Sequence, residues 1–315
     1  MIPRPNIHGK KSQGSFDLTY FLQGAFAGGI CCSITHGALH PVDVVKTRIA
    51  LNYRESMIAG FRQVIAEEGV SALTIGLGPT VVGYFLQGWF KFGGVEFFKI
   101  NFAQQLGEAR AWELRIPIYL GAAICTEFIT DIFLCPLETT RIRLVSNPEY
   151  ASGVISALPK ILSEDGLIKG FYSGFGPILL KQIPYTMAKF TVQGVAVENI
   201  CAATGVNTNT ASERTKLAIS LSSGAIAGVA SAIISHPADT LLFLINKEGA
   251  VGEGTLITRL GRLAYETGFV KLCVTGLGAR CAMIGSLTAG QFGIFDTIMS
   301  LAGTSKFKFT SENKN

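Results

Sequence analysis

Polar side chains recur at a fixed distance from three glycines, inside stretches of sequence that are otherwise apolar. Fifteen residues after each glycine stands a lysine or a glutamine. The polar residues are Lys91, Lys189 and Gln291, and the glycines are Gly76, Gly174 and Gly276. Three equivalent helices that each offer a polar group at one depth can converge on a central space, where two ammonium groups would attract an anion. The alternative is that the lysines extend to the aqueous surface and keep their charges in water.

A second group of charges follows three prolines, Pro41, Pro136 and Pro237. Each proline is followed two residues later by an acid and, in the first two copies, five residues later by a base. The acids are Asp43, Glu138 and Asp239, and the bases are Lys46 and Arg141, whereas the third copy has Leu242. Because the copies lie about a hundred residues apart, the sequence predicts three homologous units.

The composition indicates a membrane protein. Of the 315 residues, 48% are hydrophobic and 16% are charged, against about a quarter charged in soluble domains. The stretch 18–39 contains no Asp, Glu, Lys or Arg. At about 1.5 Å per helical residue, it is long enough to cross a hydrocarbon core of about 30 Å. The net charge of +5 is spread along the chain, which argues against a nucleic-acid-binding patch and suits anionic lipid or an anionic substrate.

Each unit repeats one order of elements: a long apolar helix, the proline motif, a short polar helix and a second apolar helix. The segments expected to span the membrane are 18–39, 76–102, 116–134, 174–202, 217–235 and 276–302, and the short surface helices are 52–68, 154–164 and 255–267. The expected organisation is an N-terminal tail 1–15, repeats 16–106, 107–204 and 205–304, and a disordered C-terminal tail 305–315. We therefore predict an all-α membrane protein with six transmembrane helices in three pseudo-threefold repeats. With two spans per unit, all three motifs lie on one face of the membrane and both termini on the other.

The cysteines and other reactive side chains do not form a recognisable catalytic or metal-binding set. The seven cysteines are Cys31, Cys32, Cys125, Cys135, Cys201, Cys273 and Cys281. They lack the CxxC spacing of a metal site and are expected to be reduced structural thiols. Neither a nucleophile–base pair nor a phosphate-binding loop is evident, so the sequence argues against an enzyme, and no cofactor is expected.

The proline motif in three copies, each followed by a short helix and paired glycines, resembles the mitochondrial carrier family across nearly the whole chain. Segments similar to the branch that carries phosphate are His40-Pro41-Val42-Asp43, Gly78-Pro79-Thr80, Lys91-Phe92-Gly93-Gly94, Cys135-Pro136-Leu137-Glu138 and Lys181-Gln182-Ile183-Pro184-Tyr185. The resemblance implies a barrel of six tilted helices in the inner mitochondrial membrane, with the short surface helices on the matrix side. It also implies alternating access, import of phosphate with a proton or against hydroxide, contact with lipids such as cardiolipin, and a monomer.

The resemblance places ligand contacts on the second helix of each unit, at the level of Lys181. Among the three equivalent positions Lys181 is the only charged residue, and Gln182 lies next to it. A small anion has no reason to be held threefold, so Lys181 is the first candidate for contact with phosphate. Further candidates for binding are Lys91, Lys189 and Gln291, and also Gln87 and Tyr185, either of which could equally be a packing residue.

Phosphate import against a negative matrix needs a compensating proton, because each charge costs about 2.3 kcal/mol per 100 mV. Three titratable residues lie inside apolar spans: His36, Glu127 and Asp131. Glu127 and Asp131 are four residues apart and share a helix face. We expect these residues, with Glu138, to couple the proton, although a lone histidine in a span is more often a packing residue.

The resemblance further implies that each motif acid pairs with the base of the following repeat. This would give the pairs Asp43–Arg141 and Asp239–Lys46 in a gate on the matrix side. Glu138 would face Leu242, and a desolvated carboxylate without a cation is expected to take up a proton. On the intermembrane side an incomplete motif leaves Glu96, Lys99 and Asp296 as gate candidates.

Other functions stay open at this stage. A protein of the same branch could carry copper or another small anion, since Cys31 and Cys32 lie one helical turn from His36. A membrane scaffold descended from a carrier, without transport, is a further alternative.

Overall fold

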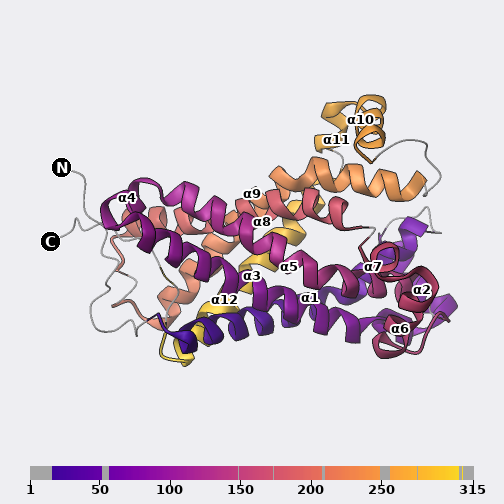
Figure 1. Cartoon of the computed structure of the whole chain (residues 1–315), viewed down its shortest axis with the longest axis horizontal. Coiled ribbons are helices and arrows are strands. Elements are labelled where there is room, and N and C mark those ends of the chain that lie inside the picture. The colour runs from indigo at the N-terminus through magenta and orange to yellow at the C-terminus, as the bar shows by residue number, and fades with distance from the viewer. Residues whose placement is uncertain are drawn as a thin grey trace.

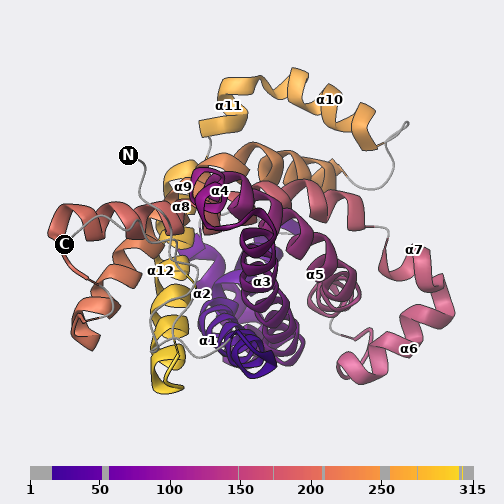
Figure 2. The same cartoon turned by 60° about the vertical axis from the view of Figure 1, so that its left-hand side comes forward.

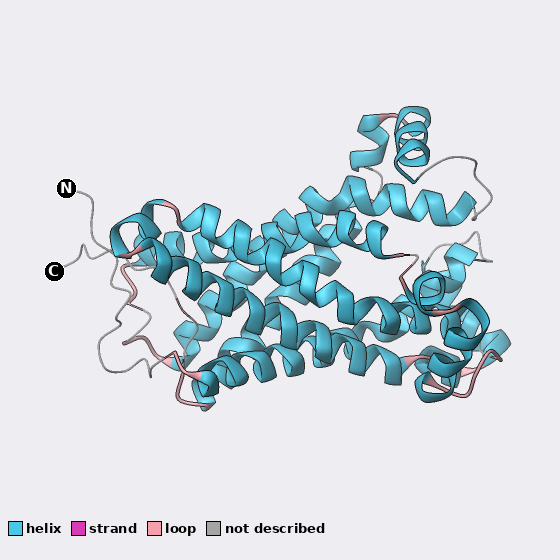
Figure 3. Ribbon diagram, viewed as in Figure 1, coloured by secondary structure: helices cyan, strands magenta, loops and turns pink. Residues whose placement is uncertain are grey.

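The computed structural model describes residues 16–51, 57–147, 149–172, 174–207, 210–248, 256–274, 276–304 and 307. Within this part of the chain every regular element is helical (Figure 3). The side chains of a few residues inside the helices are also outside the description, among them those of Lys46, Arg141 and Leu242.

Six long helices form the body of the described molecule (Figure 1). They are α1 (Leu18–Leu51), α3 (Leu77–Leu106), α5 (Arg115–Ser146), α8 (Phe175–Thr204), α9 (Glu213–Glu248) and α12 (Leu277–Leu301). Each packs on the next in this order, and α12 packs on α1, so the helices close into a ring. The predicted all-α fold with six long helices in three repeats is confirmed.

Among the residues that the structure describes, four segments are long and apolar enough to cross a membrane by length and composition alone. They are Leu18–Val45, Arg115–Thr140, Glu213–Leu241 and Val270–Leu301. The helices α3 and α8 are each 30 residues long but carry several charged residues, including the lysines at the predicted central depth. Some of these charged residues are thus the ones that carry the candidate chemistry.

The short helices lie outside the ring of long helices. They are α2 (Met57–Glu68), η1 (Val70–Thr74), α6 (Val154–Asp165), α7 (Leu167–Phe171), α10 (Leu256–Thr267) and α11 (Phe269–Val274). All of them lie toward one end of the molecule, whereas α4 (Glu108–Glu113) lies at the opposite end, where α1 begins (Figure 1). In the turned view, the pairs α6–α7 and α10–α11 project outward from the long helices that they contact, α5 and α9 (Figure 2). The helix α4 lies between the expected spans 76–102 and 116–134, where the sequence predicts no helix.

The first long helix of each repeat runs further than the sequence suggested. Pro41, Pro136 and Pro237 all lie inside helices, where the predicted spans ended before the prolines. In the first repeat the helix continues because Val44 and Val45 are buried, and Val45 packs with Val64 and Ala72 of the short helices. The motif residues therefore form the last turns of long helices.

Glycines bring two pairs of helices into backbone contact. A Cβ atom on Gly28 of α1 or Gly88 of α3 would overlap the carbonyl oxygen of the other residue. On α9, a Cβ atom on Gly224 or Gly228 would overlap the backbone of α12. Small residues at such positions are typical of closely packed transmembrane helices. By contrast, a Cβ atom on Gly24 would meet no neighbouring atom within 4 Å, so Gly24 makes no such contact.

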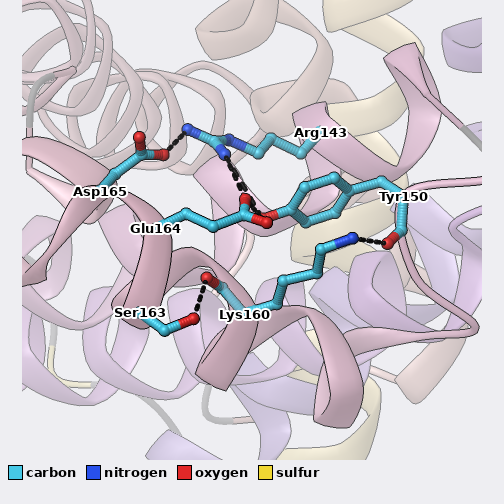
Figure 4. Close-up of polar contacts among 6 residues, drawn as sticks. All are labelled: Arg143, Tyr150, Lys160, Ser163, Glu164 and Asp165. Carbon is cyan, nitrogen blue, oxygen red and sulfur yellow. Dashed lines mark hydrogen bonds and ion pairs between the residues drawn. The ribbon is translucent and has the colours of Figure 1, made fainter.

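A polar network fixes α6 against the end of α5 (Figure 4). Arg143, near the end of α5, pairs with Asp165 of α6. The Tyr150 hydroxyl donates to Glu164 Oε2 at 2.7 Å, and Lys160 Nζ donates to the Tyr150 carbonyl at 2.9 Å. Exposed ion pairs of this kind contribute little singly, but together they restrain the connection between a long helix and its surface helix.

Candidate functional site

A buried lysine and two buried acids meet between α3 and α5. Lys91 Nζ lies 2.9 Å from Glu127 Oε1, and the side chains are 5% and 0% exposed. Asp131 lies one turn beyond Glu127 and is also fully buried. Its carboxylate oxygens have no hydrogen-bond donor among the described residues. One ammonium group therefore faces two carboxyl groups. The cluster of three side chains is electrically neutral when one of the carboxyl groups carries a proton.

The second buried lysine, Lys189 of α8, has different neighbours. Its ammonium group donates a hydrogen bond to the Gln291 side-chain oxygen on α12. Three phenylalanine rings surround the ammonium group at centroid distances of 5.1, 5.5 and 5.6 Å, namely Phe92, Phe190 and Phe292. Cation–π contacts attract the ammonium group but do not neutralise its charge. Within the described part of the chain, no carboxylate lies at ion-pair distance from Lys189.

Tyr185 links the two lysines. Its ring centroid is 5.8 Å from Lys91 Nζ and 5.9 Å from Lys189 Nζ. Lys91, Lys189 and Gln291 are at most 4% exposed, so the structure brings these three residues to the centre of the molecule and does not extend them to the aqueous surface. Gln87 is buried one turn before Lys91. The arrangement offers two ammonium groups and a phenol around one point.

Lys181 lies one turn from Tyr185, on the side of the proline motifs. Its Nζ is 3.4 Å from Asp239 Oδ1, and its side chain is 41% exposed. The same carboxylate pairs with Arg280 of α12. The neighbouring Gln182 is half-buried. Sequence reasoning missed Arg280, although an arginine inside an apolar span, four residues after Gly276, is a signal that could have been followed.

The two histidines of α1, His36 and His40, have different surroundings. The His36 ring is stacked on the Tyr84 ring at a centroid distance of 3.5 Å. His40 contacts the Thr80 hydroxyl at 3.1 Å and the Ile75 carbonyl at 2.9 Å. His40 thereby fastens α1 to the start of α3. The contact described for His36 is with a tyrosine, and the acids of α5 lie on another helix.

The predicted matrix gate is described only in part. Asp43 and Glu138 are half-buried, and Asp239 contacts Lys181 and Arg280. The side chains of Lys46 and Arg141 fall outside the described part. The pairs Asp43–Arg141 and Asp239–Lys46 therefore stay predictions.

At the opposite end of the molecule a residue of the C-terminal segment is buried. Lys99 Nζ lies 2.6 Å from Glu96 Oε2 in the same helix and donates to the Phe307 carbonyl at 2.8 Å. The Tyr20 hydroxyl donates to Glu96 Oε1 at 2.7 Å and accepts from the Phe307 N–H at 3.0 Å. The expectation of disorder in 305–315 is thus wrong at Phe307. Its backbone groups are satisfied by side chains, and its ring packs against Phe16 and Lys99.

Other charges at this end also have local partners. Asp296 of α12 accepts a hydrogen bond from Ser220 of α9, within the same repeat. Arg115 Nε lies 3.2 Å from Glu198 Oε2 and joins α5 to α8, a pair that sequence reasoning did not identify. The intermembrane-side candidates therefore bond within their own repeats or to the C-terminal segment.

The cysteines form no disulfide among the described residues. All seven lie in this part of the chain, and Cys31 and Cys32 are buried. Among the described residues, no group of three or more His, Cys, Asp or Glu side chains is arranged to hold a metal ion.

Comparison with known proteins matches the chain along nearly its whole length. The family described as "Mitochondrial carrier protein" matches residues 18–106, 113–201 and 213–306. "Mitochondrial substrate carrier family protein N" of Dictyostelium discoideum is 45% identical over 94% of this chain and 99% of the relative. "Probable mitochondrial phosphate carrier protein" of Schizosaccharomyces pombe is 37% identical over 93% and 94%. "Phosphate carrier protein, mitochondrial" of Caenorhabditis elegans is 38% identical over 89% and 80%.

Proposed function

Because the chain belongs to the mitochondrial carrier family, we propose that it imports inorganic phosphate together with a proton, or in exchange for hydroxide, by alternating access. The family and the long apolar helices make it a multi-pass protein of the mitochondrial inner membrane, as expected from the sequence. The names of several relatives, which are phosphate carriers, support phosphate as the substrate.

The uncompensated charge of Lys189 carries the proposal. A buried ammonium group whose polar partner is the neutral Gln291 amide is available to an anion, because binding breaks no ion pair. Phosphate placed beside Tyr185 would come within reach of both buried lysines, and hydrogen bonds between ammonium and phosphate are among the strong ones. Gln87 lies at the same distance from its glycine as Tyr185, and Gln182 lies about one turn nearer the start of its helix, so both can add neutral donors.

The acids of α5 would supply the proton coupling. With Lys91 held by Glu127 at 2.9 Å, a proton shared between Glu127 and Asp131 removes the second negative charge from a buried site. A carrier that moves phosphate and this proton together avoids the cost of about 2.3 kcal/mol per charge per 100 mV. His36 and Glu138 are further candidates along the proton route.

The polar groups at the two ends would form the alternating gates. On the matrix side we assign this role to the motif residues Asp43, Lys46, Glu138, Arg141 and Asp239. On the intermembrane side Glu96 and Lys99 bind the C-terminal Phe307, and Asp296 binds Ser220. A gate opens when such contacts on one side break while those on the other side hold.

Uptake by liposomes that contain the purified protein tests the proposal. We expect radiolabelled phosphate to enter faster when the outside is made acidic, and Lys181→Gln and His36→Ala to reduce this uptake. Lys216→Gln serves as a control because Lys216 is exposed and pairs only locally with Glu213. Copper uptake without phosphate uptake, or parental rates in both site variants, would contradict the proposal.

A further inference from the structure

Asp239 lies between two cations from the helices on either side of it. Its Oδ1 atom is 3.4 Å from Lys181 Nζ of α8, and its Oδ2 atom pairs with Arg280 of α12. The helices α8 and α12 both pack on α9. Each carboxylate oxygen therefore has its own cation, an arrangement that two oxygens of a phosphate group can reproduce.

The guanidinium group of Arg280 is held in a fixed orientation. Its second terminal nitrogen donates to the Ser235 hydroxyl at 3.0 Å. Ser235 is fully buried and donates in turn to the Ser231 carbonyl at 2.7 Å. The Nε atom of Arg280 is buried and has no hydrogen-bond partner among the described residues. An oriented guanidinium with an unused donor is suited to an oxyanion with several acceptor oxygens.

We propose that Lys181 and Arg280 form an anion-binding pair, that Asp239 occupies this pair in the absence of substrate, and that phosphate must displace Asp239 in order to bind there. The inference deepens the proposed function and rests on it. Two cations share one acid, so the pair retains a net positive charge. Phosphate can engage both cations and the unused Nε donor, whereas the Asp239 carboxylate has only two oxygens to offer.

The displacement would link binding to the gate. Asp239 is the acid of the third proline motif and is predicted to pair with Lys46 in the matrix gate, so phosphate that takes Lys181 and Arg280 changes the partners left to a gate residue. An internal competitor lowers the apparent affinity for the external ligand, because only the fraction of molecules with a vacated pair can bind it. Removal of the competitor and removal of a cation therefore have opposite effects on the phosphate concentration at half-maximal uptake.

The test compares single substitutions in liposomes by the phosphate concentration that gives half-maximal uptake. Arg280→Gln should raise this concentration by about tenfold or more, since a charge-assisted hydrogen bond is lost. Arg280→Lys should restore part of the affinity, because the charge returns without the planar fork. Asp239→Asn should lower the concentration by about fivefold, whatever it does to the maximal rate.

The matched control is Arg115→Gln, which removes an interhelical arginine–carboxylate pair at the other end of the molecule and should leave the half-saturation concentration unchanged. The phosphate-induced rise in melting temperature in detergent is a second readout that needs no transport. Arg280→Lys and Asp239→Asn keep that measurement possible if Arg280→Gln does not fold. A parent that carries phosphate while the Arg280 and Asp239 variants match the control overturns the inference alone. A parent without phosphate uptake overturns the proposed function itself.

Discussion

The two buried lysines occupy the same position in successive repeats but have opposite surroundings. Lys91 is paired with the Glu127 carboxylate and lies near a second acid. Lys189 is bonded to the neutral Gln291 amide and enclosed by aromatic rings. The first two repeats thus share a lysine at the same depth, but the group that balances its charge differs between them. On the side of Lys91, which we call the acid side, the charge is held in an internal ion pair. On the side of Lys189, which we call the open side, the charge remains available.

The sequences that precede the prolines explain this difference. Glu127 stands nine residues before Pro136, and the equivalent position before Pro237 is Gly228. Gly228 has no side chain to reach Lys189 and instead packs against the backbone of α12. Likewise, the position of Asp131 is occupied by Ala232 in the third repeat. The acid side and the open side of the centre therefore follow from substitutions within one repeated helix.

Removing the lysine on the acid side should have the largest effect. Lys91→Gln leaves Glu127 and Asp131 buried without a cation, and such a loss costs about 3 to 5 kcal/mol. We expect a large fall in the melting temperature of the purified protein. The double substitution Lys91→Gln with Glu127→Gln should recover most of this loss, and a single variant as stable as the parent would show that the pair is not a buried ion pair in the folded protein.

Removing the nearer acid should separate proton coupling from binding. In Glu127→Gln, Asp131 remains to balance Lys91, so we expect the protein to fold and to exchange phosphate for phosphate at equal pH. Acidification of the outside should no longer accelerate net uptake, because the proton has lost one of its two carboxyl groups. Uptake at several imposed pH gradients measures this, and an undiminished response to pH would exclude Glu127 from the proton route.

Placing an acid on the open side should make the two sides alike. Gln291→Glu gives Lys189 a carboxylate partner, and we expect the half-saturation concentration for phosphate to rise by about tenfold without loss of thermal stability. Gln291→Met removes the amide without adding charge and should change affinity less. Equal effects of the two substitutions would mean that the charge on Lys189 is not what the substrate uses.

The smallest effect is expected at the residue between the lysines. Tyr185→Phe keeps the ring that both ammonium groups approach but removes the hydroxyl. A neutral hydrogen bond contributes about 0.5 to 1.5 kcal/mol, so the half-saturation concentration should rise by about threefold. A control with the same change, Tyr265→Phe, alters an exposed residue and should have no effect on phosphate uptake.

Much of the fold was predictable because it depends on local sequence patterns. Glycines and prolines at repeating positions marked the starts of the second helices and the motifs, and apolar runs marked the spans. The ends of the first helices were not predictable in the same way. Helix α1 continues to Leu51 because Val45 packs against residues of the following short helices, and such tertiary burial cannot be read from the proline.

The sequence predicted the depth at which the site residues lie, but not which of them pair with one another. The spacing from the glycines selected Lys91, Lys189 and Gln291, all of which are buried at the centre. Which lysine contacts an acid depends on how α3, α5 and α8 are rotated about their axes, and no local sequence pattern predicts these rotations. Arg280 was missed because it stands outside the repeated spacing. Phe307 was missed because its partners, Glu96 and Lys99, lie more than two hundred positions earlier in the chain.

The glycine contacts determine which parts of the ring can shift relative to one another. Where Gly28 meets Gly88, and where Gly224 and Gly228 meet α12, backbone touches backbone with no side chain between them to change rotamer. The pairs α1–α3 and α9–α12 are therefore constrained to move as rigid bodies. Helices are instead expected to slide and rotate against one another at boundaries that long polar side chains bridge, such as Lys91 to Glu127 and Lys181 to Asp239. Two of the surfaces expected to move thus carry interhelical ion pairs, whereas the Asp239–Arg280 pair lies within the α9–α12 unit.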